Sequence, residues 1–509
     1  MQKRIKDLLT DIKILKFYPE DYYQFLEKNV SSIKYNSKEI KPNDIFVCLG
    51  GQHTEGILYV DEAIKNGAIC IVADKEVRFM NNNVLYILVD DARVALAKLS
   101  SNFYDNPSKK MLLIGITGTN GKTTVTYLLE SIFREANYNP AVIGTINYRF
   151  NDKIYLSKNT TPFASDLQGL LYEMYVSSVE VVIMEVSSHA LDQKRVLGCD
   201  FDVAVFTNLS SEHLDYHKNM DEYFLAKSIL FKNLNKDKKE IFKDSKLGKK
   251  VCVINYDDEY GKKLINMLED KEVLLYGKGN NGKNKFKAVN ITYFKDKTQF
   301  EIQRNGNKVF IESQLLGEFN VYNILASYVV AYSQGIEDSK IVDGIKKVTN
   351  IKGRLEKIPT PKGYDVIIDY AHTPDALQKV ILTLKKIPHR KLIVVFGCGG
   401  DRDRNKRPVM GSIATTLSDY VILTSDNPRN EDPQKIILDI EVGIKKSKNT
   451  NYEIMVDRKE AIFKALSIAQ QGDIVLLAGK GHEDYQIIGD KKIHFDEREI
   501  INDFFRMQK

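Results

Sequence analysis

The chain has 509 residues, too many for one compact core, and at roughly 100 to 200 residues per domain it should form about three domains. Its 74 Lys and Arg against 68 Asp and Glu give a net charge of +6, a small and dispersed excess that argues against nucleic-acid binding. Residues 1–7 lead into alternating polar and apolar residues without the apolar run and cleavage site typical of a signal peptide, and no apolar run approaches the length that spans a bilayer. We therefore expect a cytoplasmic protein with no membrane span. Five widely spaced cysteines exclude a disulfide framework and a zinc site.

The first hundred residues alternate short strand-like and helix-like segments. Residues 44–49 have the apolar character of a strand, and residues 60–64 suit a helix. Turn-forming residues follow at 105–108. We predict a small α/β domain over 1–107.

A strand, a glycine loop and a helix come next, at 111–116, 117–124 and 125–133. This order opens a phosphate-binding domain. Apolar runs at 181–184 and 203–206 should join the same parallel sheet, and a helix should span 320–330. The Lys-, Asn- and Gly-rich segment 236–307 predicts a peripheral excursion. We place this central domain over 108–334.

A further series of strands begins beyond residue 335, at 366–368, 392–396, 420–423 and 474–477. It predicts a Rossmann-like domain over 335–509. The fold class is therefore α/β with three domains: a small N-terminal α/β domain, a central P-loop-type parallel sheet with flanking helices, and a C-terminal Rossmann-like α/β domain.

The loop at 117–124 reads T-G-T-N-G-K-T-T and predicts an ATP phosphate site. Its glycines let backbone N–H groups turn toward an anion at a helix N-terminus; Lys122 would neutralise β/γ-phosphate charge and Thr123 would bind Mg²⁺. The loop departs from the usual Walker spacing because Ile116 stands five before Gly121, and the alternative is a tight turn that carries a lysine. The predicted ATP-binding residues here are Gly118, Thr119, Asn120, Gly121, Lys122, Thr123 and Thr124.

Two candidate metal ligands follow buried strands. Glu185 comes directly after the strand at 181–184, where a sheet's carboxyl edge collects such ligands, and His213 follows the next strand. Without further support, His213 beside Asp215 would be an ordinary surface residue. Lys227, in an amphipathic segment, would ordinarily be a solvated lysine.

Together these motifs resemble the Mur ligase family. The resemblance covers all three predicted domains in order. Within the family, the motifs are most like those of members that add the third residue of the cell-wall stem peptide. The matching segments are 117–124, 159–162, 185–189, 207–213, 317–323, 353–354, 369–374, 397–403, 426–429 and 479–483.

The resemblance implies roles in catalysis and nucleotide binding. Glu185 and His213 would hold a second Mg²⁺, while Thr123 serves the first. Lys227 would be carbamylated, which replaces a cation by an anion able to bind the metal. The implied catalytic residues are Lys122, Lys227, His213 and Glu185, and the further nucleotide-facing residues are Asn255, Asn320, Arg354 and Asp369.

The resemblance also implies a site for a UDP-linked substrate. Arg195 suits an anionic part of that substrate. Ser37 would lie near the uracil, although residues 36–38 read N-S-K where the family usually has D-S-R. The remaining residues of this set are Asn159, Thr160, Thr161, Ser187 and Gln193.

For the incoming amino acid, the resemblance points to residues 426–429, which read D-N-P-R. An arginine fork at Arg429, assisted by Arg402, could bind the second carboxylate that distinguishes a diamino dicarboxylic acid from lysine. Standing alone, the same four residues could be only a turn. The predicted amino-acid-binding residues are Arg402, Asp426, Asn427, Arg429, Gly479 and Glu483, with Asp426 and Glu483 accepting from the distal ammonium.

The implied activity is ATP-dependent ligation of meso-diaminopimelate or a similar diamino dicarboxylic acid to UDP-N-acetylmuramoyl-L-alanyl-D-glutamate, in peptidoglycan precursor synthesis. The route is an acyl phosphate, which needs no protein nucleophile. The partners are then the UDP-N-acetylmuramoyl-dipeptide, ATP, Mg²⁺ and the amino acid, and we expect a monomer. The alternatives are a related Mur or folylpolyglutamate ligase with another acceptor, and a non-catalytic nucleotide-binding protein.

Overall fold

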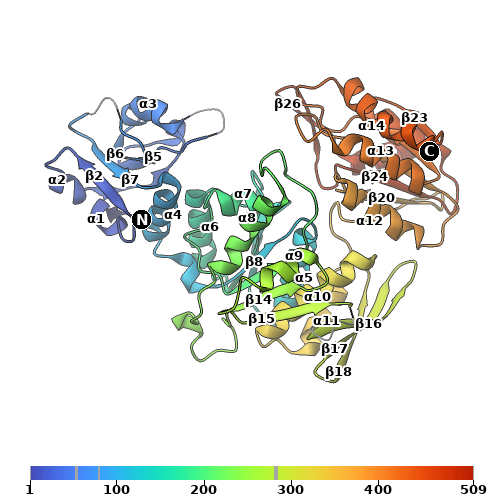
Figure 1. Ribbon diagram of the computed structural model, residues 1–509, viewed down its shortest axis with the longest axis horizontal. Helices are drawn as coiled ribbons and strands as arrows, with labels where there is room; N and C mark the ends of the chain where they lie inside the picture. Colours follow the sequence, from blue (N-terminus) through green and yellow to red (C-terminus); the bar gives the residue numbers. More distant parts are fainter. Residues whose placement is uncertain (1, 52–54, 78–80, 280–284, 508–509) are drawn as a thin grey trace.

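A computed structural model describes residues 2–51, 55–77, 81–279 and 285–507. Three helix-covered β-sheets follow one another along the chain. Figure 1 shows them as a blue lobe on the left, a cyan-to-yellow lobe in the lower middle, and an orange-to-red lobe on the right. The α/β fold predicted from the sequence is confirmed.

The N-terminal lobe has a five-stranded sheet in the order β2-β7-β6-β5-β4, antiparallel only between β2 and β7. Ile45 and Val47 face a core that includes α1 and α4, whereas Phe46 faces the α3 side, as the two-residue period of a strand requires. Its elements are Lys3–Arg4 (β1), Ile14–Tyr18 (β2), Asn29–Val30 (β3), Ile33–Lys34 (β4), Asp44–Val47 (β5), Ala68–Ala73 (β6), Leu85–Val89 (β7), Ile5–Leu8 (α1), Tyr23–Leu26 (α2), Val60–Lys65 (α3) and Ala92–Phe103 (α4).

The central lobe has an eleven-stranded sheet whose middle, β9-β12-β8-β13-β14-β15-β16, is parallel. Its strands are Leu112–Thr117 (β8), Pro140–Ile143 (β9), Asn147–Phe150 (β10), Lys153–Leu156 (β11), Val181–Glu185 (β12), Val203–Phe206 (β13), Val251–Asn255 (β14), Val273–Gly277 (β15), Phe286–Tyr293 (β16), Thr298–Arg304 (β17) and Asn307–Ser313 (β18). Its helices are Lys122–Glu135 (α5), Ala164–Val176 (α6), Ser188–Asp192 (α7), Met220–Lys232 (α8), Glu259–Ile265 (α9), Glu318–Ser333 (α10) and Asp338–Lys347 (α11).

Helices cover both faces of this sheet. Leu112, Ile114 and Ile116 of β8 pack in one core with α5, α10 and α11, and Leu113 packs in the opposite core with α6 and α8. A strand buried on both faces must be apolar throughout, which is why β8 reads as a continuous apolar run.

Two sequence-based expectations need correction here. Residues 236–307 are not only a peripheral excursion, because β14 is a fully buried strand paired with β13, and β15 and β16 continue the sheet. The place of these strands in the sheet was not predicted because the connections between them are rich in lysine and asparagine. In addition, α11 lies beyond the expected boundary at 335 yet packs against α5 in the central core.

The C-terminal lobe has a six-stranded sheet in the order β19-β20-β24-β21-β22-β23, antiparallel only between β19 and β20. This order places β24, β21 and β22 side by side. Its elements are Glu356–Pro359 (β19), Asp365–Asp369 (β20), Leu392–Phe396 (β21), Tyr420–Leu423 (β22), Tyr452–Ile454 (β23), Ile474–Ala478 (β24), Tyr485–Ile488 (β25), Lys491–His494 (β26), Pro374–Lys385 (α12), Lys406–Leu417 (α13), Pro433–Ser447 (α14), Arg458–Ile468 (α15) and Glu497–Arg506 (α16).

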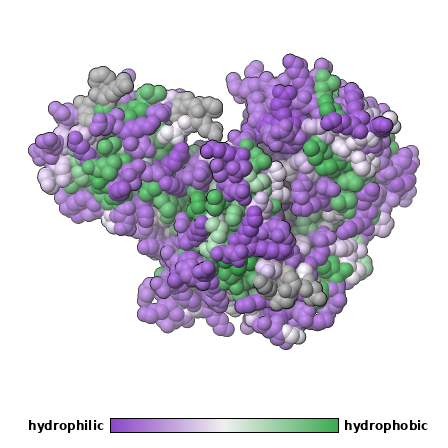
Figure 2. Space-filling view, in the orientation of Figure 1, coloured by the Kyte–Doolittle hydropathy of each residue, from purple (hydrophilic) through white to green (hydrophobic). Residues whose placement is uncertain are grey.

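The surface in the view of Figure 2 is mostly hydrophilic, with apolar residues in scattered groups, and it is indented between the left and right lobes. Among the described residues, no helix combines the length and apolar character needed to cross a bilayer.

Candidate active site

The loop between β8 and α5 is held against the end of β13. Thr119 N and Asn120 N donate to the backbone and side-chain oxygens of Asn208, at 2.8 and 3.0 Å. Gly118 has φ +145°, and a Cβ there would lie 2.0 Å from Thr207 Oγ1. The tight turn therefore needs glycine, and it leads into the N-terminus of α5, where an anion is favoured.

Two lysine side chains converge on one carbonyl oxygen of this loop. Lys122 Nζ donates to Gly118 O at 2.9 Å and to Thr119 O at 2.8 Å, and Lys227 Nζ donates to Gly118 O at 2.9 Å. Burial lowers the pKa of Lys122. Both predicted lysines thus lie beside the phosphate loop, as their proposed roles require.

Lys227 is buried on α8, with 2% of its surface exposed. Its Nζ lies 4.6 Å from the centre of the Tyr223 ring. Burial first, and then the nearby charge of Lys122, hold the pKa of Lys227 well below its usual range. The ordinary interpretation of Lys227 as a solvated lysine is therefore wrong. Its buried surroundings favour the neutral amine over the ammonium.

Glu185, at the end of β12, is buried and bonded to threonines. Its Oε1 accepts from Thr123 Oγ1 and from Thr145 N, both at 3.0 Å, and its Oε2 accepts from Thr145 Oγ1 at 3.0 Å. The structure thus brings the predicted metal ligands Thr123 and Glu185 together. Thr124, next on α5, is buried as well.

His213 follows β13 with φ +58° and lies beside Glu212. Its Nε2 is 3.8 Å from Glu212 Oε2. Although 42% of the His213 side chain is exposed, the surrounding protein desolvates the ring and lowers its pKa to about 4. A neutral imidazole is the form that can bind a metal.

Three contacts join this site to the C-terminal lobe. Arg354 Nη2 donates to Thr123 Oγ1, Asn120 Nδ2 donates to Asp375 Oδ2, and His372 Nε2 lies next to Glu212 Oε1, each at 3.2 Å. In each contact, the partner from the central lobe lies on or next to the phosphate loop. The predicted ATP-binding residues therefore come from two lobes that contact each other here.

Asp369 and Asn255 of the predicted nucleotide set are committed to the backbone. Asp369 accepts from Leu355 N and Ala371 N, and burial raises its pKa. Asn255 Nδ2 donates to Thr207 O at 2.8 Å. Both side chains hold loops that border the phosphate site.

Asn320 lies in the first turn of α10. Its Nδ2 donates to Leu316 O, and its Oδ1 accepts from Asn323 Nδ2. A Cβ on Gly121 would lie 2.3 Å from Asn323 Oδ1. This pair therefore connects α10 to the phosphate loop.

All of the predicted UDP-substrate residues except Ser37 form one cluster at the border of the N-terminal lobe. Arg195 donates to Thr161 O at 2.9 Å and to Gln193 Oε1, and its guanidinium stacks 4.0 Å from the Phe163 ring. Burial lowers the pKa of Arg195. Ser187 caps α7, and its backbone N–H donates to Thr161 Oγ1 at 3.1 Å.

Thr160 extends this cluster toward the metal ligands, because its Oγ1 lies 3.1 Å from Thr145 Oγ1. Asn159 is exposed beside it, and its carbonyl accepts from the Tyr148 hydroxyl. The predicted UDP-substrate residues therefore adjoin the predicted metal ligands, because the Thr145 hydroxyl contacts both Thr160 and Glu185.

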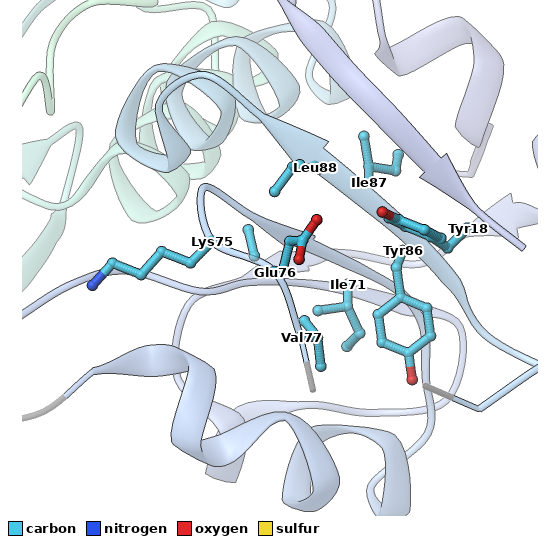
Figure 3. A pocket seen from close by; sticks show the side chains of 9 residues that line it. Tyr18, Ile71, Lys75, Glu76, Val77, Tyr86, Ile87 and Leu88 are labelled. Carbon is cyan, nitrogen blue, oxygen red and sulfur yellow. The ribbon is translucent and has the colours of Figure 1, made fainter. Parts of the chain in front are cut away.

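Ser37 lies apart from that cluster, in the N-terminal lobe. It begins a 3₁₀ turn at Ser37–Glu39, is buried, and donates to Glu62 Oε2 at 2.5 Å. A small hollow in the same lobe is a separate feature. Figure 3 shows it lined mainly by apolar side chains of β2, β6 and β7, with Lys75 and Glu76 at its edge, and it includes no predicted site residue.

The predicted amino-acid pocket is assembled from the loops after β21, β22 and β24, which are adjacent strands. Arg429, with φ +51°, donates from Nη1 to Gly400 O at 2.8 Å. Burial, and then the charge of Arg402, lower its pKa, so these two cations lie near each other. Arg402 is exposed and donates to Asp401 O at 3.0 Å.

Acidic and amide groups line the other side of this pocket. Glu483 Oε2 accepts from Asn427 Nδ2 at 2.9 Å and from the buried Lys480 Nζ at 3.2 Å, and burial raises the pKa of Glu483. Gly479 has φ +114°, and a Cβ there would lie 2.6 Å from Asp426 Oδ2. The predicted positive and negative groups thus come from different loops at the carboxyl ends of adjacent strands.

The oxygen donors at the phosphate loop fit Mg²⁺. This ion prefers few protein oxygens and completes its shell with phosphates and water. Thr123 and Glu185 supply such oxygens next to the loop. Among the described residues, no group of three His, Cys, Asp or Glu side chains forms a ready-made metal site.

Sequence reasoning missed Glu212, Thr145 and Lys480. Glu212 precedes His213, and burial opposes its ionisation, yet the hydrogen bond with His372 and the charges of His213 and Lys122 outweigh burial and lower its pKa. Lys480 stands inside the matched segment 479–483, which was its only signal. Thr145 carries no motif that would have marked it.

Comparison with known families gives three matches in chain order. They are Mur ligase family, catalytic domain, over residues 29–104; Mur ligase middle domain, over 116–331; and Mur ligase, glutamate ligase domain, over 353–481.

Several curated proteins named UDP-N-acetylmuramoyl-L-alanyl-D-glutamate–2,6-diaminopimelate ligase are similar over nearly the whole chain. The protein from Caldanaerobacter subterraneus is 46% identical over 93% of this chain and 94% of its own length. A Clostridium acetobutylicum protein is 41% identical over 99% of both chains. The Fusobacterium nucleatum protein is 44% identical over 93% of this chain and 94% of its own.

Solved structures agree in fold. One of UDP-N-acetylmuramoyl-L-alanyl-D-glutamate–2,6-diaminopimelate ligase is 31% identical, with a TM-score of 0.69 over 100% of this chain and 99% of that one. The Acinetobacter baumannii MurF structure is 18% identical, with a TM-score of 0.67 over 100% of this chain and 99% of that one, and shows the fold alone.

Proposed function

Because this chain belongs to the Mur ligase family, we propose that its pocket of paired arginines selects a diamino dicarboxylic acid as the amino acid it ligates. The chain is an ATP-dependent ligase that joins 2,6-diaminopimelate to UDP-N-acetylmuramoyl-L-alanyl-D-glutamate in peptidoglycan precursor synthesis. We take the meso form as the substrate.

The observation that carries this proposal is the charge arrangement at the carboxyl ends of β21, β22 and β24. Arg429 and Arg402 supply cations for the distal carboxylate, while Asp426 and Glu483 supply anions for the distal ammonium. Lysine has the ammonium but lacks the carboxylate. The two arginines are therefore the basis of the choice.

In the proposed reaction, the γ-carboxylate of the D-glutamyl residue attacks the γ-phosphate of ATP, and ADP leaves. The amine of the incoming amino acid then attacks the acyl phosphate, loses a proton and expels phosphate. Lys122, on the phosphate loop, offsets the negative charge that would otherwise keep the carboxylate away from ATP. Bound Mg²⁺ would supply further charge neutralisation, with Thr123, Glu185 and His213 positioned to hold it.

We further propose that Lys227 is carbamylated. Its buried amine has a strongly lowered pKa, and a neutral amine is the form that attacks CO₂. The new N–C bond forms a carbamate and releases one proton. The lysine side chain, which is ordinarily positive, then carries a negative charge. The carbamate would then complement Mg²⁺, and it would replace the amine that shares Gly118 O with Lys122.

Substrate and nucleotide roles are proposed for the remaining clusters. Ser37, Asn159, Thr160, Thr161, Ser187, Gln193 and Arg195 would bind the UDP-linked dipeptide, and the stacked Arg195 supports this by offering a cation beside the metal set. The loop residues 118–124, with Asn255, Asn320, Arg354 and Asp369, would surround ATP. Their convergence from two lobes supports this.

We propose that the division into 1–107, 108–334 and 335–509 holds with one change. The packing of α11 in the central core supports a second boundary near residue 352. We also propose a cytoplasmic monomer, since both ATP and UDP-linked precursors are cytoplasmic substrates.

The experiment that tests the substrate is an amino-acid screen. The purified protein is given UDP-N-acetylmuramoyl-L-alanyl-D-glutamate, ATP and Mg²⁺ with one amino acid at a time, and product mass and released phosphate are measured. Product with meso-diaminopimelate and far less with L-lysine is expected. Equal kcat/KM for the two would contradict the proposal, and phosphate release without any product would favour a different acceptor.

A further inference from the structure

A buried arginine contacts both loops that carry the proposed amino-acid-binding arginines, and it is not itself one of the predicted substrate-binding residues. Arg407, in the first turn of α13, is fully buried. Its Nη1 donates to Glu431 Oε2 at 2.8 Å and its Nη2 to Glu431 Oε1 at 2.8 Å, a two-pronged ion pair. Such a pair fixes geometry as well as charge.

This ion pair connects the two loops that carry the pocket arginines. The loop after β21 contains Arg402, and the loop after β22 contains Arg429. Arg407 Nη2 also contacts Gly399 O, at 3.3 Å, in the first loop, while its partner Glu431 belongs to the second. Glu431 Oε1 in turn accepts from Asp401 N, at 2.6 Å, back in the first loop.

Backbone contacts between the same loops are close. Gly400 N donates to Asn427 O at 2.9 Å, and a Cβ on Gly400 would lie 1.9 Å from Pro428 O. Asn430 Nδ2 donates to Asp401 Oδ2 at 2.9 Å. A small separation of the loops would break several of these contacts together.

The loops need such a connection because they carry like charges. Arg402 and Arg429 lie on either side of Gly399, where a Cβ would be 2.9 Å from Arg429 Nη1 and 4.0 Å from Arg402 Cγ. Burial first, and then the charge of Arg402, lower the pKa of Arg429. The carboxylate of a bound substrate would offset the repulsion between these like charges, but before binding only the protein can. Holding two cations in place in advance lowers the cost of ordering them when the substrate arrives.

Resting on the proposed function, we propose that the Arg407–Glu431 ion pair is a positioning element that keeps Arg402 and Arg429 at the spacing needed to bind the distal carboxylate of the amino acid. Both residues act through the loops, and neither touches the substrate.

Asp439 of α14 offers a matched control. It accepts from the same guanidinium, at 2.9 Å from Arg407 Nη1, and also from Arg404. Within the described part of the chain, the Asp439 carboxylate accepts from these two arginines and bonds to no residue of 399–402 or 427–431. Asp439→Ala therefore removes one carboxylate from Arg407, as Glu431→Ala does, without removing the link between the loops.

The test compares Glu431→Ala, Arg407→Lys and Asp439→Ala in the full chain. Steady-state KM is measured for meso-diaminopimelate, ATP and the UDP-linked dipeptide. Glu431→Ala and Arg407→Lys should raise KM for the amino acid about tenfold or more, with kcat at saturation and KM for ATP within about threefold of wild type. Asp439→Ala should leave all values near wild type.

Thermal unfolding identifies loss of fold. If Arg407→Lys does not fold, Glu431→Ala decides the matter, because its side chain is partly exposed and its removal leaves Arg407 paired with Asp439. Equal effects of Glu431→Ala and Asp439→Ala, or an unchanged KM for the amino acid in Glu431→Ala, would overturn the proposal. If wild type fails to use meso-diaminopimelate, the proposed function fails, and the variants are compared with the amino acid that the screen identifies.

Discussion

Single side chains at the phosphate loop differ from ordinary surface residues in their surroundings. Lys122 and Lys227 lie on one carbonyl oxygen, Glu185 is buried beside Thr123, and His213 is desolvated. Each is held by contacts that orient it toward the loop, so substitutions here should change chemistry more than stability.

Lys122→Ala should reduce kcat by about a hundredfold or more, because one cation that offsets phosphate charge is lost. Phosphate release at saturating substrates measures it. The melting temperature should stay near that of wild type, since Lys122 bonds only to carbonyls of its own loop. Wild-type turnover by a folded variant would remove the loop from the mechanism.

Lys227→Ala should lose most activity and regain part of it when a short carboxylate such as formate is added, because the added anion replaces the carbamate. Lys227→Arg is the control, since a guanidinium keeps the positive charge but cannot be carbamylated. Full activity of Lys227→Arg would mean that a cation is what the site needs. Mass measurement of the intact wild type in bicarbonate gives an independent readout.

Arg429→Ala should erase most of the preference for meso-diaminopimelate over L-lysine. In wild type, lysine would leave a partly desolvated guanidinium unpaired, at a cost on the order of 1 to 3 kcal/mol or more, so selectivity should be roughly a hundredfold or greater. The loss should appear in kcat/KM for the dicarboxylate, with lysine activity unchanged or slightly higher. A variant that stays selective would show that Arg429 is not the deciding group.

At the scale of elements, adjacent parallel strands decide which loops meet. The loops that carry the proposed amino-acid-binding residues follow β21, β22 and β24, which are neighbours in the sheet. The loops that carry the proposed phosphate-site residues follow β8, β12 and β13, which are also neighbours. Backbone shape at the strand ends is therefore part of the site.

Gly479→Ala should raise KM for the amino acid about tenfold, because the new Cβ would meet Asp426 Oδ2 at 2.6 Å at a backbone angle that favours glycine. Gly472→Ala is a matched control before the same strand. Its φ is +86°, and a Cβ there would lie 3.8 Å from Arg390 Cβ. If KM rises equally in both variants, backbone strain alone explains the increase, and the contact with Asp426 does not contribute.

Long apolar runs made most strands predictable. The run at 203–206 coincides with β13, and that at 392–396 with β21, since both are buried on both faces. The place of β14 in the central sheet was not predicted, because its neighbours are rich in lysine and asparagine. Motif residues were predictable, but Glu212 and Arg407 were not, because their importance depends on which loops the fold brings together.

At the scale of the whole molecule, three contacts near the phosphate loop join the central and C-terminal lobes. An acyl phosphate must be kept from water while the amine approaches, and closure of two lobes does this. ATP binding and lobe closure should therefore be linked.

Asp375→Ala should weaken that linkage, because it removes the acceptor for Asn120 of the phosphate loop. Loss of one hydrogen bond of about 1 kcal/mol would change the closed-to-open ratio about fivefold. Small-angle scattering with a non-hydrolysable ATP analogue should show a more extended variant. Lys379→Ala, which removes only the exposed partner of Asp375 within α12, should match wild type; equal scattering from all three proteins would refute the linkage.

The residues proposed to bind the amino acid all lie on loops of the C-terminal sheet. The C-terminal lobe, and with it the choice of amino acid, could therefore be inherited separately from the central lobe. Recombination near residue 352 would exchange wall chemistry between lineages while leaving the energy-converting lobe unchanged. The exchange would succeed only if the incoming module kept partners for Thr123, Asn120 and Glu212, the contacts through which the two lobes meet. Exchange of this lobe would then change the composition of the wall and leave the way the bond is formed as it is.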